Sequence, residues 1–286
     1  PRNDLEAAYA LCTRLANSHY ENFGVVSWLL PHSLRQPMYA LYAFCRHTDD
    51  LGDEATGDRL ALLDAWEQDL GQCYEGTPQH PILVALQDVV DRFGIPETPF
   101  RKLVQANRMD QGRVRFATYA DLLRYCDHSA NPVGHMVLYL TRYASPDNME
   151  KSDATCTALQ LANFWQDVQR DHAKDRIYLP MEDMARSGYA EADLAAGRVN
   201  DEFRTLMRFE VERTQALFER GLPLLDRVHG RFRLDLALFS KGGMRVLDAI
   251  REQDYDVLSK RPVVSGRRKL WLTVSTAARL ALLGRP

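Results

Sequence analysis

The sequence lacks several features that define large classes of protein. No apolar run in its 286 residues approaches the roughly 20 residues that span a bilayer. Five cysteines are scattered without a Cys-x-x-Cys or zinc-like spacing, which favours a reduced, cytoplasmic protein. The first residues lack the basic and apolar regions of a signal peptide. Acidic residues outnumber basic ones, 39 against 36, so no nucleic-acid partner is expected. Glycine-rich nucleotide-binding loops are also absent.

Strand patterns are scarce, and helical patterns fill most of the chain. Apolar residues recur at spacings of three and four, most plainly at Phe203, Leu206, Met207, Val211, Leu217 and Phe218. Helix breaks are predicted at Pro31 and at residues 76–78, 94–99, 145–147, 179–180 and 229–230. Because no Pro/Gly/Ser linker divides the chain, we expect one all-α domain over residues 1–286.

A first acidic stripe is predicted on a helix that contains residues 39–54. At about 100° of rotation per residue, four side chains stay within one narrow stripe: Tyr42, Arg46, Asp49 and Asp53. Asp50 and Glu54 lie beside it, so the carboxylates of this segment repel one another. Magnesium would relieve the repulsion, because it takes oxygen ligands and commonly bridges protein carboxylates to phosphate oxygens.

A second polar stripe is predicted between residues 159 and 171. Steps of three, four and four align Gln160, Asn163, Asp167 and Asp171. Apolar neighbours flank these polar groups, which makes them costly to desolvate without partners. Either stripe alone is most simply a solvated helix face with salt bridges. Two such stripes fit a metal and diphosphate cluster between facing helices, with nearby cations for the phosphate oxygens: Arg46, Arg170, Arg176 and Lys174.

At these residues the chain resembles the squalene and phytoene synthase family of head-to-head prenyl synthases. The resemblance runs from about residue 19 to residue 255. Residues 46–54 resemble the family's first aspartate-rich motif, and residues 160–171, followed by 175–180, resemble the second. It implies an all-α isoprenoid-synthase helical bundle around a central apolar cavity, capped by the two motifs and magnesium.

The resemblance also implies the residues of the site. The expected Mg²⁺ ligands are Asp49, Asp50, Asp53, Asn163, Asp167 and Asp171. Substrate-binding residues are expected at His19, Phe23, Arg46, Gln160, Gln166 and Arg176. Catalytic roles are expected for Tyr42, Tyr125, Asp49 and Asp167, with the tyrosines positioning water or facing a cation with their rings. For each tyrosine alone, a core position with a satisfied hydroxyl is an equally good interpretation.

One position departs from the pattern of enzymes that join two prenyl diphosphates. Those enzymes usually carry Arg directly before the aspartate where this chain has Gln166, so one fixed positive charge for diphosphate is missing. Gln166, residues 19–31 and residues 129–134 together resemble the bacterial hydroxysqualene synthase branch. In that branch presqualene diphosphate, made by a sister enzyme, becomes hydroxysqualene, which a flavoenzyme then reduces to squalene for hopanoids.

Other interpretations stay open at this point. One is a squalene or phytoene synthase that starts from two prenyl diphosphates, and another is a non-catalytic assembly factor of the same fold, in which motif carboxylates would be lost. A ferritin-like bundle is not indicated, because no histidine follows a glutamate by three residues. The apolar run 270–283, preceded by basic residues, is expected either to dock on the core or to lie on the inner membrane as a peripheral contact.

Overall fold

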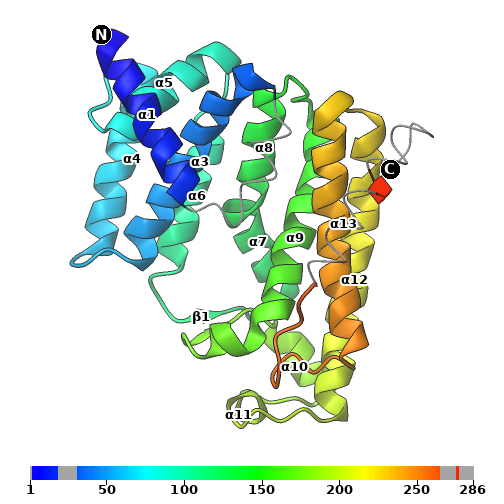
Figure 1. The fold of residues 1–286 in the computed structure, drawn as a ribbon. Coiled ribbons are helices and arrows are strands. Elements are labelled where there is room, and N and C mark those ends of the chain that lie inside the picture. Colours follow the sequence, from blue (N-terminus) through cyan, green and yellow to red (C-terminus); the bar gives the residue numbers. More distant parts are fainter. Residues whose placement is uncertain (1, 19–30, 265–274, 277–286) are drawn as a thin grey trace. The chain divides into compact units, whose positions relative to one another are not determined.

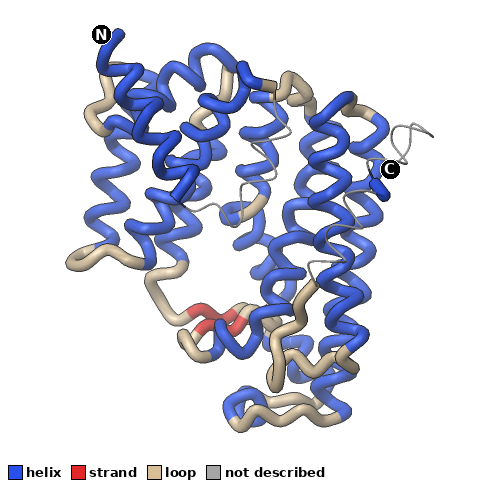
Figure 2. The backbone as a smooth tube through the Cα atoms, viewed as in Figure 1, coloured by secondary structure: helices blue, strands red, loops and turns tan. Residues whose placement is uncertain are grey.

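The computed structural model describes residues 2–18, 31–264 and 275–276, and most of the residues in these ranges are helical (Figures 1 and 2). The expected all-α fold is therefore confirmed. The strands described, β1 (Val114–Arg115) and β2 (Arg176–Ile177), form one short parallel pair. Among the described helices, none is both long and apolar enough to cross a membrane.

The chain divides into two compact units. Unit 1 comprises residues 1–112 and 128–149, and unit 2 comprises residues 113–127 and 150–286. Each unit has its own cluster of buried apolar side chains. The expectation of a single domain over residues 1–286 stays a prediction.

Unit 1 is a bundle in which α3 is the central helix. Its helices are α1 (Arg2–Ser18), α3 (His32–Asp53), α4 (Arg59–Glu75), α5 (Pro81–Phe93), α6 (Thr98–Met109) and α8 (Asn131–Leu140). The α3 helix packs against each of the other five, and Figure 1 shows α1 lying across it. Breaks predicted from the sequence coincide with helix ends: Pro31 precedes α3, Gly76 follows α4, and Gly94 ends α5. The left-handed backbone at Gly94, with a φ of 67°, suits glycine.

The buried face of α3 fixes the direction of its opposite, acidic face. Phe44 stacks on Trp66 at 5.5 Å between ring centroids and meets Phe100 edge-on at 5.1 Å. The Trp66 Nε1 donates a hydrogen bond of 2.9 Å to Thr48 Oγ1, so this buried polar pair is satisfied. Because Thr48 and Gly52 are buried, the residues that follow them, Asp49 and Asp53, point away from the core.

Unit 2 is built around long helices joined by shorter elements. It contains β1, most of α7 (Tyr119–Ser129) and of α9 (Pro146–His172), β2, α10 (Met181–Ser187), α11 (Glu191–Ala195), α12 (Asp201–Gly221), the 3₁₀ helix η1 (Leu222–Asp226) and α13 (Gly230–Glu252). The amphipathic helix predicted from residues 203–218 is α12, and Phe203, Leu206 and Met207 are buried on its inner face. Predicted breaks again fall at helix starts, since Pro180 precedes α10 and His229 precedes α13.

A buried ionic cluster ties α10 to α12 within unit 2. The Arg213 guanidinium lies 2.8 Å from Asp183 Oδ2 and 2.5 Å from Glu210 Oε2, and it covers the ring of Tyr119 at 3.5 Å. Both acids are buried, and burial raises the pKa of Glu210 to about 8. Arg186 lies 3.0 Å from Asp183 Oδ1, so Arg213 is shared by the two desolvated carboxyl groups and Asp183 has a second cation.

Candidate functional site

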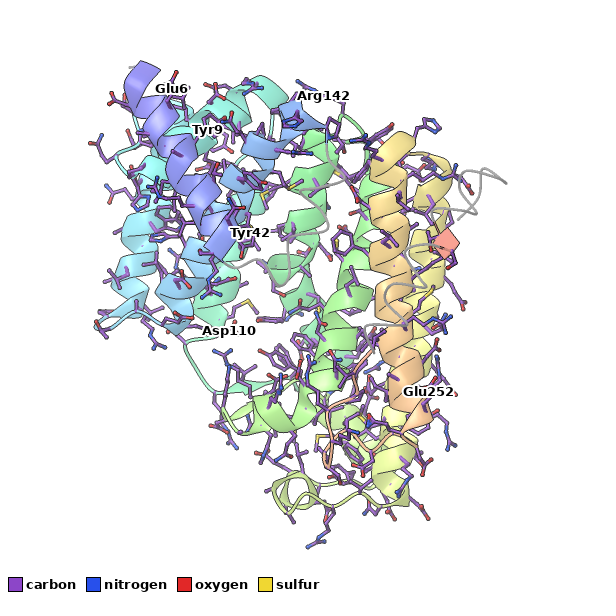
Figure 3. The ribbon with its side chains drawn as sticks, viewed as in Figure 1. Glu6, Tyr9, Tyr42, Asp110, Arg142 and Glu252 are labelled. Atoms are coloured by element: carbon purple, nitrogen blue, oxygen red, sulfur yellow. The ribbon has the colours of Figure 1, made fainter. Side chains whose placement is uncertain are left out.

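The first acidic stripe lies on the last turns of α3, as the sequence predicts. Asp49 and Asp53, one turn apart, are both exposed, and Figure 3 shows Tyr42 further back on the same helix. Arg46 does not extend away from the helix. Its Nη2 lies 2.5 Å from Asp50 Oδ1 and 2.8 Å from Glu54 Oε1, so it neutralises the acids that flank the stripe.

Asn107 on α6 orients Asp49, and no local sequence pattern marks this residue. The buried Asn107 Nδ2 donates hydrogen bonds of 3.2 Å to Asp49 Oδ1 and to Leu103 O. Gly52 permits this approach of α6, because a Cβ at position 52 would lie 2.3 Å from Asn107 Oδ1. Gln111 adds a bond of 2.9 Å to Gly52 O. The end of α3 is thus fixed by two amide side chains, one on α6 and one just after it.

The surroundings of Asp49 disfavour its ionised form. Its side chain is accessible to solvent, yet the surrounding protein partly desolvates it, and this desolvation together with the charge of Asp53 raises its pKa to about 6. The hydrogen bond from Asn107 opposes the rise. A nearby cation would stabilise the ionised form.

The second stripe lies on α9, but the helix is not regular along it. Asp167 has a φ of −109° and a ψ of 15°, so α9 kinks at the residue expected to bind metal. Gln160 and Asn163 precede the kink, and Asp171 follows it. The uniform spacing assumed from the sequence therefore holds only as far as Asn163, and the kink sets the direction of the carboxylates beyond it.

The segment that follows α13 supplies an unpredicted partner for the second motif. Arg261 Nε donates to Asp167 Oδ1 at 2.6 Å, and its Nη2 donates to Asp167 Oδ2 at 2.8 Å and to Gln166 Oε1 at 2.9 Å. The buried Gln166 also donates through Nε2 to Pro262 O at 2.5 Å. Arg170 is a weaker partner, with its Nη1 3.5 Å from Asp167 Oδ1.

Asp171 lies in a small pocket of unit 2 beside Arg176. The pocket holds about 10 Å³ of free space, room for a single water, and its charged lining residues are Asp171 and Arg176. Desolvation, followed by the charge of Asp167, raises the pKa of Asp171 to about 7. Arg115 holds the turn before Arg176, because its guanidinium bonds Asp175 O and Asp175 Oδ1, both at 2.6 Å.

Tyr125 belongs to a cluster of four aromatic rings in unit 2. Phe164 and Tyr178 stack with centroids 3.7 Å apart, and Tyr125 lies 6.2 Å and 5.9 Å from them. Phe116 closes the cluster at 5.4 Å from Tyr125. Tyr125 is almost fully buried, so the core interpretation and the catalytic one both remain compatible with its position.

The metal-binding prediction fits the donors that each unit provides. In the part of the chain that is described, no three Asp, Glu, His or Cys side chains gather into a metal-binding group. Each motif by itself offers a carboxylate pair, in which the charge of Asp53 raises the pKa of Asp49 and the charge of Asp167 raises the pKa of Asp171. Oxygen donors of this kind suit magnesium. That the two pairs share cations stays a prediction, because they belong to different units.

Some predicted residues lie outside the described ranges. These are His19 and Phe23, together with nearly all of the C-terminal run 270–283. Their expected roles, in substrate binding and in docking or membrane contact, stay predictions. The same holds for the roles assigned to Tyr42, Gln160, Asn163 and Arg176.

Comparison with known proteins identifies the family. The squalene/phytoene synthase family model matches residues 16–268, and the chain belongs to this family. A phytoene synthase of Arthrospira platensis is 33% identical over 278 residues, which cover 92% of this chain and 90% of the relative. A 15-cis-phytoene synthase of Synechococcus elongatus is 34% identical over 285 residues, covering 93% and 91% of the two chains.

Solved structures give the same fold. The squalene synthase HpnC from Alicyclobacillus acidocaldarius matches with a TM-score of 0.86 and 44% identity, over 89% of this chain and 97% of that one. A dehydrosqualene synthase matches with a TM-score of 0.86 and 28% identity, over 98% of each chain. The isoprenoid-synthase helical fold is thereby confirmed. Members of the family act on prenyl diphosphates and use divalent metal ions to ionise them.

Proposed function

We propose that the chain converts presqualene diphosphate and water into hydroxysqualene and inorganic diphosphate. The observation that carries this proposal is residue 166, a buried, neutral glutamine whose amide oxygen accepts from Arg261 and whose amide nitrogen donates to Pro262 O. Condensation of two prenyl diphosphates requires two anionic groups to be held together, which a second fixed cation at this position would favour. Gln166 supplies no such charge, and a reaction with a single diphosphate needs none.

The acidic stripes would hold the divalent metal. Asp49, Asp50 and Asp53 in unit 1 and Asn163, Asp167 and Asp171 in unit 2 supply the oxygen ligands, and we infer that the ion is Mg²⁺. When bound, the metal neutralises charge on the diphosphate as its carbon–oxygen bond ionises. Arg176 lies beside Asp171 in the same pocket and provides a further cation for phosphate oxygens.

The remaining chemistry needs no protein nucleophile. The bond from carbon to the diphosphate oxygen breaks, and the diphosphate leaves with the electron pair. Water then forms a new carbon–oxygen bond at the rearranged cation, and its proton passes to the departed diphosphate. The ring faces of the aromatic cluster around Tyr125 could stabilise the cation and exclude other water. Because no electron is gained or lost, the product would need a separate reducing enzyme to become squalene.

Product analysis tests the proposal directly. Purified protein incubated with presqualene diphosphate and Mg²⁺, without a nicotinamide, should release hydroxysqualene identified by mass. Asp49→Ala or Asp167→Ala should lower turnover by about a thousandfold or more, because a metal ligand is lost. Asp91→Ala, which removes an exposed acid on α5, is the matched control and should keep normal turnover. Squalene formed only when NADPH is supplied would contradict the proposal.

A second candidate function is favoured by two of the relatives described above. Two phytoene synthases are 33% and 34% identical to this chain, so condensation of two prenyl diphosphates is the alternative reaction. Incubation with farnesyl or geranylgeranyl diphosphate alone separates the two. A product with twice the carbon number of the substrate would establish this alternative and overturn the first proposal.

A further inference from the structure

The segment after α13 makes contacts that the proposed reaction leaves unexplained. Arg261 and Pro262 bond to two consecutive residues of the second motif, Gln166 and Asp167, about a hundred positions earlier in the chain. Pro262 is buried, and the Arg261 side chain is one-third exposed. This segment is therefore anchored to the motif at its backbone and presents a charged group to it.

The Arg261 guanidinium occupies both oxygens of a predicted metal ligand. Its two donors lie 2.6 Å and 2.8 Å from Asp167 Oδ1 and Oδ2, a two-pronged arrangement that uses one lone pair of each oxygen. A metal ion that approaches this edge of the carboxylate must displace the guanidinium, and one that approaches another lone pair meets its positive charge. Metal binding at Asp167 must therefore compete with an internal cation.

Gln166 can keep Arg261 near the second motif whether or not the guanidinium contacts Asp167. Its Oε1 accepts from Arg261 Nη2 at 2.9 Å, and its Nε2 donates to Pro262 O. A neutral amide can do both, whereas an arginine at position 166 could only donate and would repel Arg261. The bond to Pro262 does not involve the guanidinium, so it persists when Arg261 leaves Asp167.

We propose that Arg261 is an exchangeable cation of the second motif, positioned by Gln166. It balances Asp167 while metal is absent, and it passes to a diphosphate oxygen when metal takes the carboxylate. This inference rests on the proposed function, because it needs a metal and a diphosphate at the second motif. It couples metal binding to diphosphate binding at the second motif.

Exchange of Arg261 between Asp167 and the diphosphate predicts that one variant changes two binding affinities in opposite directions. In Arg261→Ala, Mn²⁺ alone should bind about fivefold more tightly, because the competing ion pair is gone. Mn²⁺ with inorganic pyrophosphate should bind about tenfold more weakly or worse, because a charged hydrogen bond to the anion is lost. Both affinities are measured by calorimetry on the purified full chain, without turnover.

Further variants separate this role from a structural one. Lys260→Ala removes an exposed positive charge from the neighbouring position and should change both affinities by less than about twofold. Arg261→Lys keeps one charge without the two-pronged contact and should fall between wild type and Arg261→Ala. Gln166→Met has a similar volume but no amide, and it should tighten Mn²⁺ binding in wild type yet add little to Arg261→Ala.

The outcomes distinguish the inference from the function on which it rests. Wild-type protein that fails to bind Mn²⁺ with pyrophosphate would overturn the proposed function. Wild-type binding together with affinities in Arg261→Ala that are unchanged, or that shift in the same direction, would overturn the exchange alone. Should Arg261→Ala not fold, Arg261→Lys decides by the same comparison of signs.

Discussion

The contact between Gly52 and Asn107 offers a sharp test of how α6 positions the first motif. A Cβ at position 52 would lie 2.3 Å from Asn107 Oδ1 and 3.0 Å from its Cγ, distances that force Asn107 to move. Asn107 is buried and bonded to Asp49, so it has little room to do so. Gly52→Ala should consequently displace the amide that orients a predicted metal ligand.

The magnitude follows from two opposing terms. Alanine is better than glycine in a helix by about 0.5–1 kcal/mol, whereas overpacking a filled interface costs about 1–3 kcal/mol. Gly52→Ala should therefore destabilise the protein by about 1–2 kcal/mol. In an Asn107→Ala background the 2.3 Å and 3.0 Å contacts are gone and only the Cβ contact of 3.2 Å remains. There the same substitution should be within about 0.5 kcal/mol of neutral.

Urea unfolding followed by far-UV circular dichroism measures this double-mutant cycle. The four midpoints are compared at equal denaturant slope, so that they report stability. A coupling free energy near 2 kcal/mol is expected, within the usual range for contacting residues. Equal losses from Gly52→Ala in both backgrounds would refute the close approach of α6 to α3.

Three further predictions concern individual ionisable groups. Both oxygens of buried Asp235 lack a hydrogen-bond partner among the described residues, and burial raises its pKa to about 7. A carboxyl group whose pKa is raised in the folded state contributes stability at low pH, and this contribution is lost as the pH rises through 7. Asp235→Asn should therefore be more stable than wild type at pH 8, by up to about 4 kcal/mol, and the difference should close near pH 4. A difference in urea midpoint that does not change with pH would contradict this. Arg213→Met leaves buried Glu210 without its cation and leaves buried Asp183 with Arg186 alone, so it should cost about 3–5 kcal/mol in urea unfolding, whereas a loss below about 1 kcal/mol would show the ion pairs to be dispensable. Because the pKa values of Asp49 and Asp171 are raised to about 6 and 7, calorimetric Mn²⁺ affinity should fall as pH drops from about 8 to about 5; constant affinity over this range would exclude both as ligands.

Much of the local structure follows from spacing alone. Apolar residues at three- and four-residue intervals identify α12, and proline and glycine positions mark where α3, α5, α10 and α13 begin or end. The first stripe also follows from helical geometry, because α3 is regular through Asp53. Each of these properties depends on residues within a few turns of one another, so the sequence carries them directly.

The side chains that bond to the two motifs cannot be predicted from local spacing. Asn107 lies 58 residues from Asp49, and Arg261 lies 94 residues from Asp167, without any local pattern to mark either of them. The kink at Asp167 likewise departs from the uniform helix that the spacing predicts. Side chains far apart in sequence meet only through packing, and packing also sets which backbone deviations are tolerated.

The sequence by itself determined the helical class, the positions of the two acidic stripes and the kind of ligand that such oxygen donors can hold. Only the tertiary structure decided which amide orients Asp49 and which guanidinium occupies Asp167. The physical reason is the range of the interactions. Periodicity and turn chemistry act within one element, whereas the electrostatic setting of a carboxylate depends on whatever the folded chain places within a few ångströms of it.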